Sequence, residues 1–284
     1  MDWDKAKTLT IVFLLFLDAF LGISIYLERD KYYIDTQQFN KITELLKKND
    51  IYLNTSDLPS HRPLQQLSMS SYKYDETEII NMLFTEPKNV RQRDELDGKT
   101  VFLSGDQTLT IQNGFITFDC PSGTNDIELS QETALAEANR FIEGLGEISD
   151  FIFDSCFIDE EGWRIQFCNK YKDYIIYTNY VEFLVTNKGI VQIDCIYSRP
   201  KGFFGLPAEL CSVDEALLHF MQHFKDAYEN RPAEVIKVDL VYYQKEGSVT
   251  DNASLTALPH YRITVGGFEQ PFLINAYLNR IEQF

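Results

Sequence analysis

The chain has 284 residues, of which 44% are hydrophobic and 24% are charged, and this composition excludes intrinsic disorder and collagen-like repeats. Its formal net charge of -17 would repel phosphate backbones, and no stripe of lysine and arginine interleaved with aromatic residues offsets it. We therefore expect no nucleic-acid partner. A solvated surface explains the acidity, because the sequence has no D-x-[DN]-x-[DN]-G calcium loop.

The first predicted element is a transmembrane helix at residues 8–27, with the sequence TLTIVFLLFLDAFLGISIYL. A helix of about 20 residues crosses the ~30 Å hydrocarbon core of a bilayer. A cleaved signal peptide has a shorter apolar region of roughly 7 to 15 residues, and its best cleavage site here would be the weak Gly22-Ile23-Ser24. We therefore expect an uncleaved single-pass anchor.

Aromatic residues bracket this span, as they do at membrane–water interfaces: Trp3 before it, and Tyr26, Tyr32 and Tyr33 near or after its end. Basic residues flank both ends, so the positive-inside rule hardly decides the orientation. We favour a cytoplasmic amino terminus at residues 1–7, with the large carboxy-terminal part outside the cell.

Asp18 lies near the middle of the span, where an acidic residue costs ~2.5 to 3.5 kcal/mol on insertion scales. Gly22 follows one helical turn later and Ser24 is nearby, which predicts a small and polar stripe on a bulky helix. Asp18 is either merely tolerated beside a local water defect, or it is protonated and hydrogen-bonds to another membrane helix. We favour a partner contact made by Asp18, Gly22 and Ser24.

Residues 28–128 are predicted to form a membrane-proximal α+β unit. The stretch DTQQFNKITELLKKND has apolar residues at helical spacing and Asp35 as N-cap, and DETEIINMLF reads as a short helix with Asp75 and Glu78 as a capping box. Residues 52–74 are expected to be mostly loop with at most one strand. The segments TVFLS, TLTIQ and FITFD, separated by turn residues, predict a three-stranded meander over residues 100–119.

Two similar helices follow, LSQETALAEANRFI at 129–142 and CSVDEALLHFMQHF at 211–224, with Ser130 and Ser212 as N-caps. Each leads into strand-like segments. The first is followed by FIFDSCFI, WRIQFC, YIIYTNYVEFLV and GIVQIDCIY, and the second by VIKVDLVYY, HYRITV and PFLINAYL. Turn sequences at 159–162 and 187–189 predict hairpins. The expected fold is α+β: one transmembrane helix, then tandem helix-plus-antiparallel-sheet units, with the repeats at 129–205 and 206–284.

The sequence contains no G-x-S-x-G, phosphate-loop or H-E-x-x-H motif, so we expect no enzyme, no catalytic residue and no cofactor. His219 and His223 have the i, i+4 spacing of metal ligands, but they lack an adjacent carboxylate base and a third ligand, so no metal is expected. Asp159, Glu160 and Glu161 could act as acid and base, although their predicted position in a hairpin turn explains them.

Tyrosines and cysteines leave two further points open. The tyrosines of YKDYIIYTNY could line a sugar-binding groove, but the same pattern is typical of a half-buried strand, which we favour. The cysteines contain no C-x-x-C pair and predict core packing, with one disulfide left open; they are Cys120, Cys156, Cys168, Cys195 and Cys211.

With MDW at residues 1–3, a short basic stretch, a span containing Leu17-Asp18, and TNYVEFLVTNKGIVQIDCIY at 178–197, the chain resembles the YycI (WalI) family. These are membrane-anchored accessory proteins of the YycG/WalK sensor kinase in low-GC Gram-positive bacteria. The resemblance implies a cytoplasmic amino terminus, a folded extracytoplasmic part, and a complex with the kinase and a YycH-type companion. Transmembrane helices would make much of the contact, and kinase output would control cell-wall metabolism.

The expected function is therefore regulation of a sensor histidine kinase without catalysis, through contacts that favour one signalling state of the kinase. The resemblance carries no ligand-binding residue over to the outer part, and the sequence leaves open whether the kinase is activated or inhibited. The alternative is an anchored extracellular module that binds a cell-wall polymer or peptide through the tyrosine-rich sheet. An anchored hydrolase would need catalytic groups that no motif indicates.

Overall fold

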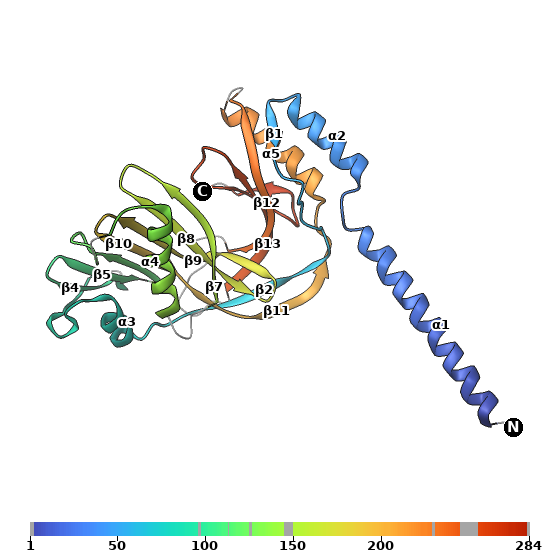
Figure 1. The fold of residues 1–284 in the computed structure, drawn as a ribbon, viewed down its shortest axis with the longest axis horizontal. Coiled ribbons are helices and arrows are strands. Elements are labelled where there is room, and N and C mark those ends of the chain that lie inside the picture. The colour runs from blue at the N-terminus through green and yellow to red at the C-terminus, as the bar shows by residue number, and fades with distance from the viewer. Residues whose placement is uncertain are drawn as a thin grey trace. The chain divides into compact units, whose positions relative to one another are not determined.

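The computed structural model describes residues 3–95, 98–112, 114–124, 127–144, 150–228, 231–244 and 255–282 (Figure 1). The helices are α1 Trp3–Asp30, α2 Thr36–Lys47, α3 Glu76–Leu83, the 3-10 helix η1 Pro87–Asn89, α4 Gln131–Gly144 and α5 Val213–Tyr228. The strands from β1 to β10 are β1 Ile51–Leu53, β2 Leu64–Ser71, β3 Arg91–Asp94, β4 Thr100–Ser104, β5 Gln107–Gln112, β6 Phe115–Asp119, β7 Phe151–Ile158, β8 Trp163–Tyr171, β9 Tyr174–Thr186 and β10 Gly189–Ile196. The later strands are β11 Ser198–Ala208, β12 Ala233–Tyr243, β13 Leu255–Val265, β14 Phe272–Asn275 and β15 Arg280–Ile281.

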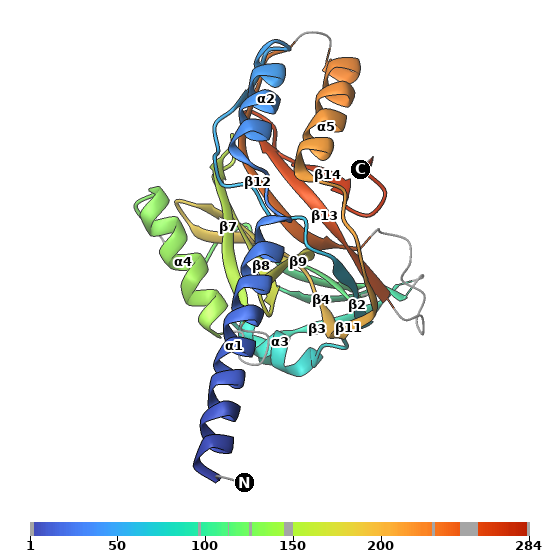
Figure 2. The ribbon, with the colours of Figure 1, turned by 90° about the vertical axis from the view of Figure 1, so that its right-hand side faces the viewer.

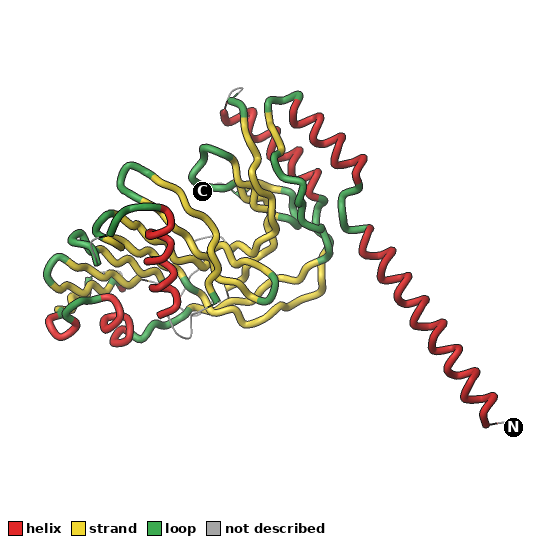
Figure 3. The backbone as a smooth tube through the Cα atoms, viewed as in Figure 1, coloured by secondary structure: helices red, strands yellow, loops and turns green. Residues whose placement is uncertain are grey.

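Helices and strands are both abundant, as Figure 3 shows, so the predicted α+β class is confirmed. By packing, the chain divides into two compact units. The first comprises Met1–Leu64, Pro207–Asp239 and His260–Phe284, and the second comprises Gln65–Leu206 and Leu240–Pro259. β12 and β13 contribute residues to both units. This division describes packing alone. The domain boundaries predicted from the sequence, at 28–128, 129–205 and 206–284, stay predictions.

Helix α1 contains the candidate membrane span. Residues Ala6–Ser24 have a mean hydropathy of 1.9, and none of this stretch is buried by the described chain. Its length and composition suffice to cross a bilayer. The predicted segment 8–27 lies within α1, so the existence of one apolar amino-terminal helix is confirmed.

In the first unit, α2 begins at the predicted N-cap. The Asp35 Oδ1 accepts the Gln38 N–H at 2.7 Å, and the Gln38 side chain accepts the Asp35 N–H at 3.4 Å, which completes a capping box. These bonds satisfy two N–H groups that the first helical turn would leave unpaired. Ile42 and Leu46 then lie one turn apart on the buried face.

The predicted helix after Ser212 is α5, which lies beside α2 in Figure 2. Its first turn is held by the Glu215 carboxylate, which accepts the Ser212 N–H at 3.2 Å. On its inner face Phe220 is fully buried, and its ring centroid lies 5.0 Å from that of Phe272 on β14. The small Ala216 and the apolar Leu217 are also fully buried.

The second unit contains an antiparallel sheet with the strand order β3-β4-β5-β6-β10-β9-β8-β7. The predicted meander is confirmed as β4, β5 and β6, in which Leu109 pairs with both Phe102 and Phe118. The hairpins predicted at 159–162 and 187–189 join β7 to β8 and β9 to β10. Asn113, part of the meander's second predicted turn, lies outside the described residues.

One face of this sheet is covered by α3 and α4. On β9 the side chains of Val181, Phe183 and Val185 alternate onto this face and are at most 1% exposed. Fully burying a side chain such as Phe183 contributes ~1.5–3 kcal/mol. The alanines of α4 on its buried face, Ala134 and Ala138, let the helix approach the sheet closely.

The strands β1, β3, β11 and β15 and two parallel pairs were not predicted. The segment 52–74, expected to hold at most one strand, contains β2 and the end of β1. The strand β3 has the sequence RQRD, and all of its residues are exposed. The strand β11 contains proline and glycine, and it is terminal in the strand order, where it neighbours β2. β12 pairs in parallel with β1 in the first unit and, through Val241 and Tyr242, in parallel with β9 in the second. Parallel pairing joins segments far apart in sequence, so local patterns do not reveal it.

Candidate functional site

The predicted partner contact lies on α1, where Asp18 and Gly22 are one turn apart and share a face. Both are exposed, and a Cβ added to Gly22 would meet no atom of the described chain within 4 Å. Ser24 lies roughly 120° around the helix from Asp18. The helix therefore brings Asp18 and Gly22 together but places Ser24 on another face. Whether a partner helix binds there stays a prediction.

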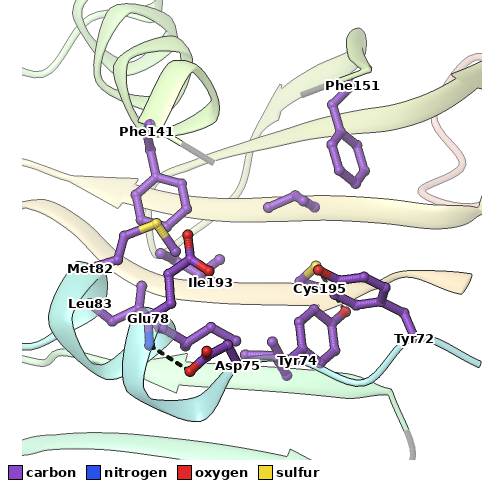
Figure 4. Close-up of a pocket in the computed structure, with 14 residues that line it drawn as sticks. Tyr72, Tyr74, Asp75, Glu78, Met82, Leu83, Phe141, Phe151, Ile193 and Cys195 are labelled. Carbon is purple, nitrogen blue, oxygen red and sulfur yellow. Dashed lines mark hydrogen bonds between the residues drawn. The ribbon is translucent and has the colours of Figure 1, made fainter. Parts of the chain in front are cut away.

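A second site, not predicted, is a pocket of about 330 Å³ in the second unit (Figure 4). It lies between α3, α4 and the covered face of the sheet. Its lining residues are Tyr72, Tyr74, Asp75, Glu78, Ile79, Met82, Leu83, Ile116, Phe141, Gly144, Phe151, Val181, Ile193 and Cys195. This volume is at the lower end of the range of about 300–1,000 Å³ that is typical of small-molecule sites.

Helix α3 forms one wall because its start is fixed. The Asp75 Oδ1 accepts the N–H groups of Thr77 at 2.9 Å and Glu78 at 3.2 Å, which confirms Asp75 as N-cap. Ile79, Met82 and Leu83, at i, i+3 and i+4, then face the same side and line the pocket.

Glu78 differs from its predicted role. It was expected to reach back to the helix start as half of a capping box, but Figure 4 shows its carboxylate turned toward Met82 and Phe141. The Asp75 side chain alone caps the first turn of α3, so the Glu78 side chain is not used for capping and lines the pocket instead.

Two polar groups at the inner wall are held neutral. The Tyr74 hydroxyl donates to the Gly114 carbonyl at 3.2 Å and lies 3.8 Å from the Cys195 Sγ. Burial raises the pKa of Tyr74 far above its ordinary value and raises the pKa of Cys195 to about 12. Because both groups stay protonated at neutral pH, neither serves as a base or a ready nucleophile there.

Tyr72 forms the remaining aromatic part of the lining. Its ring centroid lies 5.0 Å from that of Tyr74 and 5.1 Å from that of Tyr197, both in edge-to-face geometry. The Arg199 guanidinium lies over the Tyr72 ring, 5.1 Å from its centroid, so a cation already contacts this ring.

The charged residues among the 14 that line the pocket are Asp75 and Glu78, and both are exposed at its rim. The rest of the lining is aliphatic, aromatic or neutral. The pocket therefore combines an apolar interior with a negatively charged mouth, which suits binding better than acid–base or nucleophilic chemistry.

The histidines and the acidic turn have structural roles. The His219 Nδ1 lies 2.5 Å from the Asn279 carbonyl, and the His223 ring packs near Phe272. Across the described ranges, no group of three or more His, Cys, Asp or Glu residues is placed to hold a metal ion. The Asp159 carboxylate accepts the Gly162 N–H at 3.0 Å and bonds to Arg164, so it stabilises the hairpin turn.

The tyrosine-rich strand is packed. The Tyr171 and Tyr174 rings contact Phe203 with centroid distances of 5.5 and 6.1 Å, and Tyr174 also contacts Tyr242 at 5.5 Å. This arrangement fits the half-buried strand that the pattern favoured. The five cysteines all lie within the described residues, and none of them forms a disulfide there.

No protein-family model matches the chain, and no curated protein matches it. Among solved structures, an uncharacterised protein from Eubacterium rectale aligns with a TM-score of 0.52 at 12% identity, covering 82% of this chain and 90% of that one. The two proteins share a fold.

Two other solved structures align less well. The YpeB C-terminal domain from Bacillus megaterium has a TM-score of 0.42 at 12% identity, covering 75% of this chain and 97% of that one. YycH from Bacillus subtilis has a TM-score of 0.45 at 14% identity, covering 74% of this chain and 53% of that one. The resemblance to the YycI family therefore rests on the sequence alone.

Proposed function

We propose that this protein is a membrane-anchored, extracytoplasmic regulator that acts without catalysis on a sensor histidine kinase of the YycG/WalK type, together with a YycH-type companion. The observation that supports the proposal is α1: an apolar helix that the rest of the described chain leaves unburied, with Asp18 and Gly22 on one face. Its amino terminus is cytoplasmic and its folded units are outside the cell.

The energetics of Asp18 favour a partner. Placing this residue near the bilayer centre costs ~2.5–3.5 kcal/mol, and an interhelical hydrogen bond returns roughly 0.6 to 2 kcal/mol of it. Protonation removes the charge and provides an O–H donor for that bond. Gly22, one turn away, lets the partner backbone approach closely, as small residues do at membrane helix contacts.

Regulation through such a contact requires only that α1 and the outer units bind one state of the kinase better than the other. A coupling free energy of about 1–3 kcal/mol changes the ratio of the two states roughly 5- to 150-fold. Contacts on the scale of one hydrogen bond and one close helix crossing are therefore sufficient for a regulatory effect.

Co-purification of the kinase and the companion from detergent-solubilised membranes tests the proposal. The variants are Asp18→Leu and Asp18→Asn, with Phe20→Leu on another face of α1 as the matched control. We expect Leu to abolish capture, and Asn, which still hydrogen-bonds, to retain most of it. Unchanged capture by both Asp18 variants, at matched expression and insertion, would show that the aspartate is only tolerated.

Gly22→Leu gives an independent test, because a Cβ added at this position has no atom of the described chain within 4 Å. The substitution leaves the protein's own packing unchanged, so a loss of capture reports on the partner helix. Ser24→Leu should retain capture, since Ser24 lies on another face of the helix.

A further inference from the structure

We propose that the pocket between α3 and α4 binds a small organic cation: an apolar body of roughly phenylalkyl size that carries an ammonium group at one end. The site is independent of the α1 contact and lies wholly within the second unit. The inference rests on the volume, the apolar lining and the position of the two carboxylates.

The apolar interior selects the body of the ligand. Ile79 and Leu83 of α3 form one side, Phe141 of α4 another, and Val181 and Ile193 the floor on the sheet. A cavity of about 330 Å³ with such walls accommodates an aromatic ring with a short alkyl chain. Sugars and other strongly polar molecules would leave their hydroxyl groups unpaired against these walls.

The mouth selects the charge. Asp75, the N-cap of α3, and Glu78, on its first turn, are both exposed and line the pocket. Together they outweigh the positive partial charge of about half a unit at the helix amino terminus. An anion at this rim would be repelled, whereas an ammonium group is attracted.

The two ends of the pocket orient the ligand. Figure 4 shows the Glu78 carboxylate at the end near Met82 and Phe141, and Tyr72 with Cys195 at the other. Arg199 already lies over the Tyr72 ring, so a ligand cation is disfavoured at that end. The ammonium group therefore sits beside Glu78 and Met82, with the apolar body extending along Ile193.

Methionine methyl groups provide a site-specific readout in the full-length protein in lipid nanodiscs. The chain has four methionines, namely Met1, Met69, Met82 and Met221, of which Met82 lines the pocket. The probes are 4-phenylbutylamine and the neutral 4-phenylbutanol, titrated against protein labelled with ¹³C at the methionine methyls, with the Met82 resonance assigned through Met82→Leu. We expect the amine to shift Met82 saturably, to leave Met221 in place, and to bind more tightly than the alcohol.

Charge-neutral variants separate the contribution of the carboxylate from that of the apolar walls. Glu78→Gln should weaken binding of the amine roughly two- to fivefold, as expected for the loss of one partly exposed ion pair, and should leave binding of the alcohol unchanged. Glu76→Gln, on the same turn but outside the lining, should change neither probe.

Any of the following results would overturn the proposal. They are no saturable Met82 shift, equal binding of the amine and the alcohol, or an unchanged amine affinity in Glu78→Gln. Shifts of all methionine methyls together would report partition into the lipid and would also count against the pocket.

Discussion

Removing one partner of the ion pair between Asp239 and Arg262 should strongly destabilise the first unit. The Arg262 side chain is 3% exposed, and its Nε and Nη2 donate to the two Asp239 oxygens at 2.9 and 2.6 Å. This is the two-bond geometry of a strong arginine–carboxylate pair. Lys237 also contacts Asp239, at 3.0 Å, but its side chain is 50% exposed.

The substitution Asp239→Asn keeps the side-chain shape but leaves the buried guanidinium without this counter-charge. Breaking a buried pair in this way costs ~3–5 kcal/mol, which corresponds to a Tm decrease of roughly 6–20 °C for a chain of this size. Lys237→Gln, which removes the exposed partner, should cost less than ~1 kcal/mol. The contrast between the two variants tests whether burial sets the magnitude.

The measurement is thermal and urea unfolding of the full chain in nanodiscs, followed by near-ultraviolet circular dichroism. If Asp239→Asn unfolds within ~1 kcal/mol of wild type, the reasoning about this buried pair is wrong. The double variant Asp239→Leu with Arg262→Met should regain much of the loss, because replacing both partners removes the uncompensated charge.

The same pair predicts a direction for pH dependence. Burial alone would raise the pKa of Asp239, but the hydrogen bonds and charges of Arg262 and Lys237 outweigh it and lower the pKa. The stabilisation is therefore present above the ordinary carboxyl pKa of about 3.9 and is lost as pH falls through the folded-state pKa. Asp239→Asn should remove this part of the acid sensitivity, and an unchanged acid-unfolding curve would contradict the assignment.

Three further predictions follow from packing, capping and thiol burial. Phe220→Ala should destabilise the first unit by ~3–5 kcal/mol in the same unfolding assay, because its ring is fully buried; a loss below ~1 kcal/mol would contradict that packing. Asp75→Ala should cost about 1 kcal/mol through the lost N-cap of α3, whereas Asp75→Asn should cost only a few tenths, and equal losses would contradict the capping role. Burial raises the pKa of Cys195 to about 12 and of Cys211 to about 11, so at pH 8 both should alkylate slowly in the native protein and rapidly in urea, as measured by peptide mass spectrometry; fast native labelling of either would contradict this.

Local sequence patterns predicted the helices and the meander because their causes are local. The N-caps Asp35 and Asp75 act within three residues, and the turn residues before β5 act over a similar distance. Alternating apolar residues on β9 likewise identify a buried face without knowledge of the partner strands.

Two of the unpredicted strands, β3 and β11, consist of residues that disfavour strands locally. The proline and glycine residues of β11, such as Pro200 and Gly205, are tolerated because this strand is terminal in its sheet, and Gly205 has a φ of 79° that other residues rarely adopt. The exposed polar strand β3 forms because β4 provides its backbone partners.

The pocket could not be predicted because its walls come from segments far apart in the sequence. Ile79, Phe141 and Ile193 each look like ordinary core residues in their own elements. The one local indication was Glu78, an acidic residue beside an apolar helix face, and capping chemistry explained it equally well. In contrast, Asp18 stood out from the sequence because a charge is expensive in an apolar span.

The most direct test of the proposed function is photocrosslinking in living cells from single positions along α1. Leu14 and Leu21 lie on the Asp18 face, at i−4 and i+3, whereas Phe16 and Phe20 lie two residues away on other faces, and all four are exposed. A photoreactive residue at 14 or 21 should crosslink to the sensor kinase or its companion, and one at 16 or 20 should not. Equal crosslinking from all four positions, or none from positions 14 and 21, would contradict a partner contact through the Asp18 face.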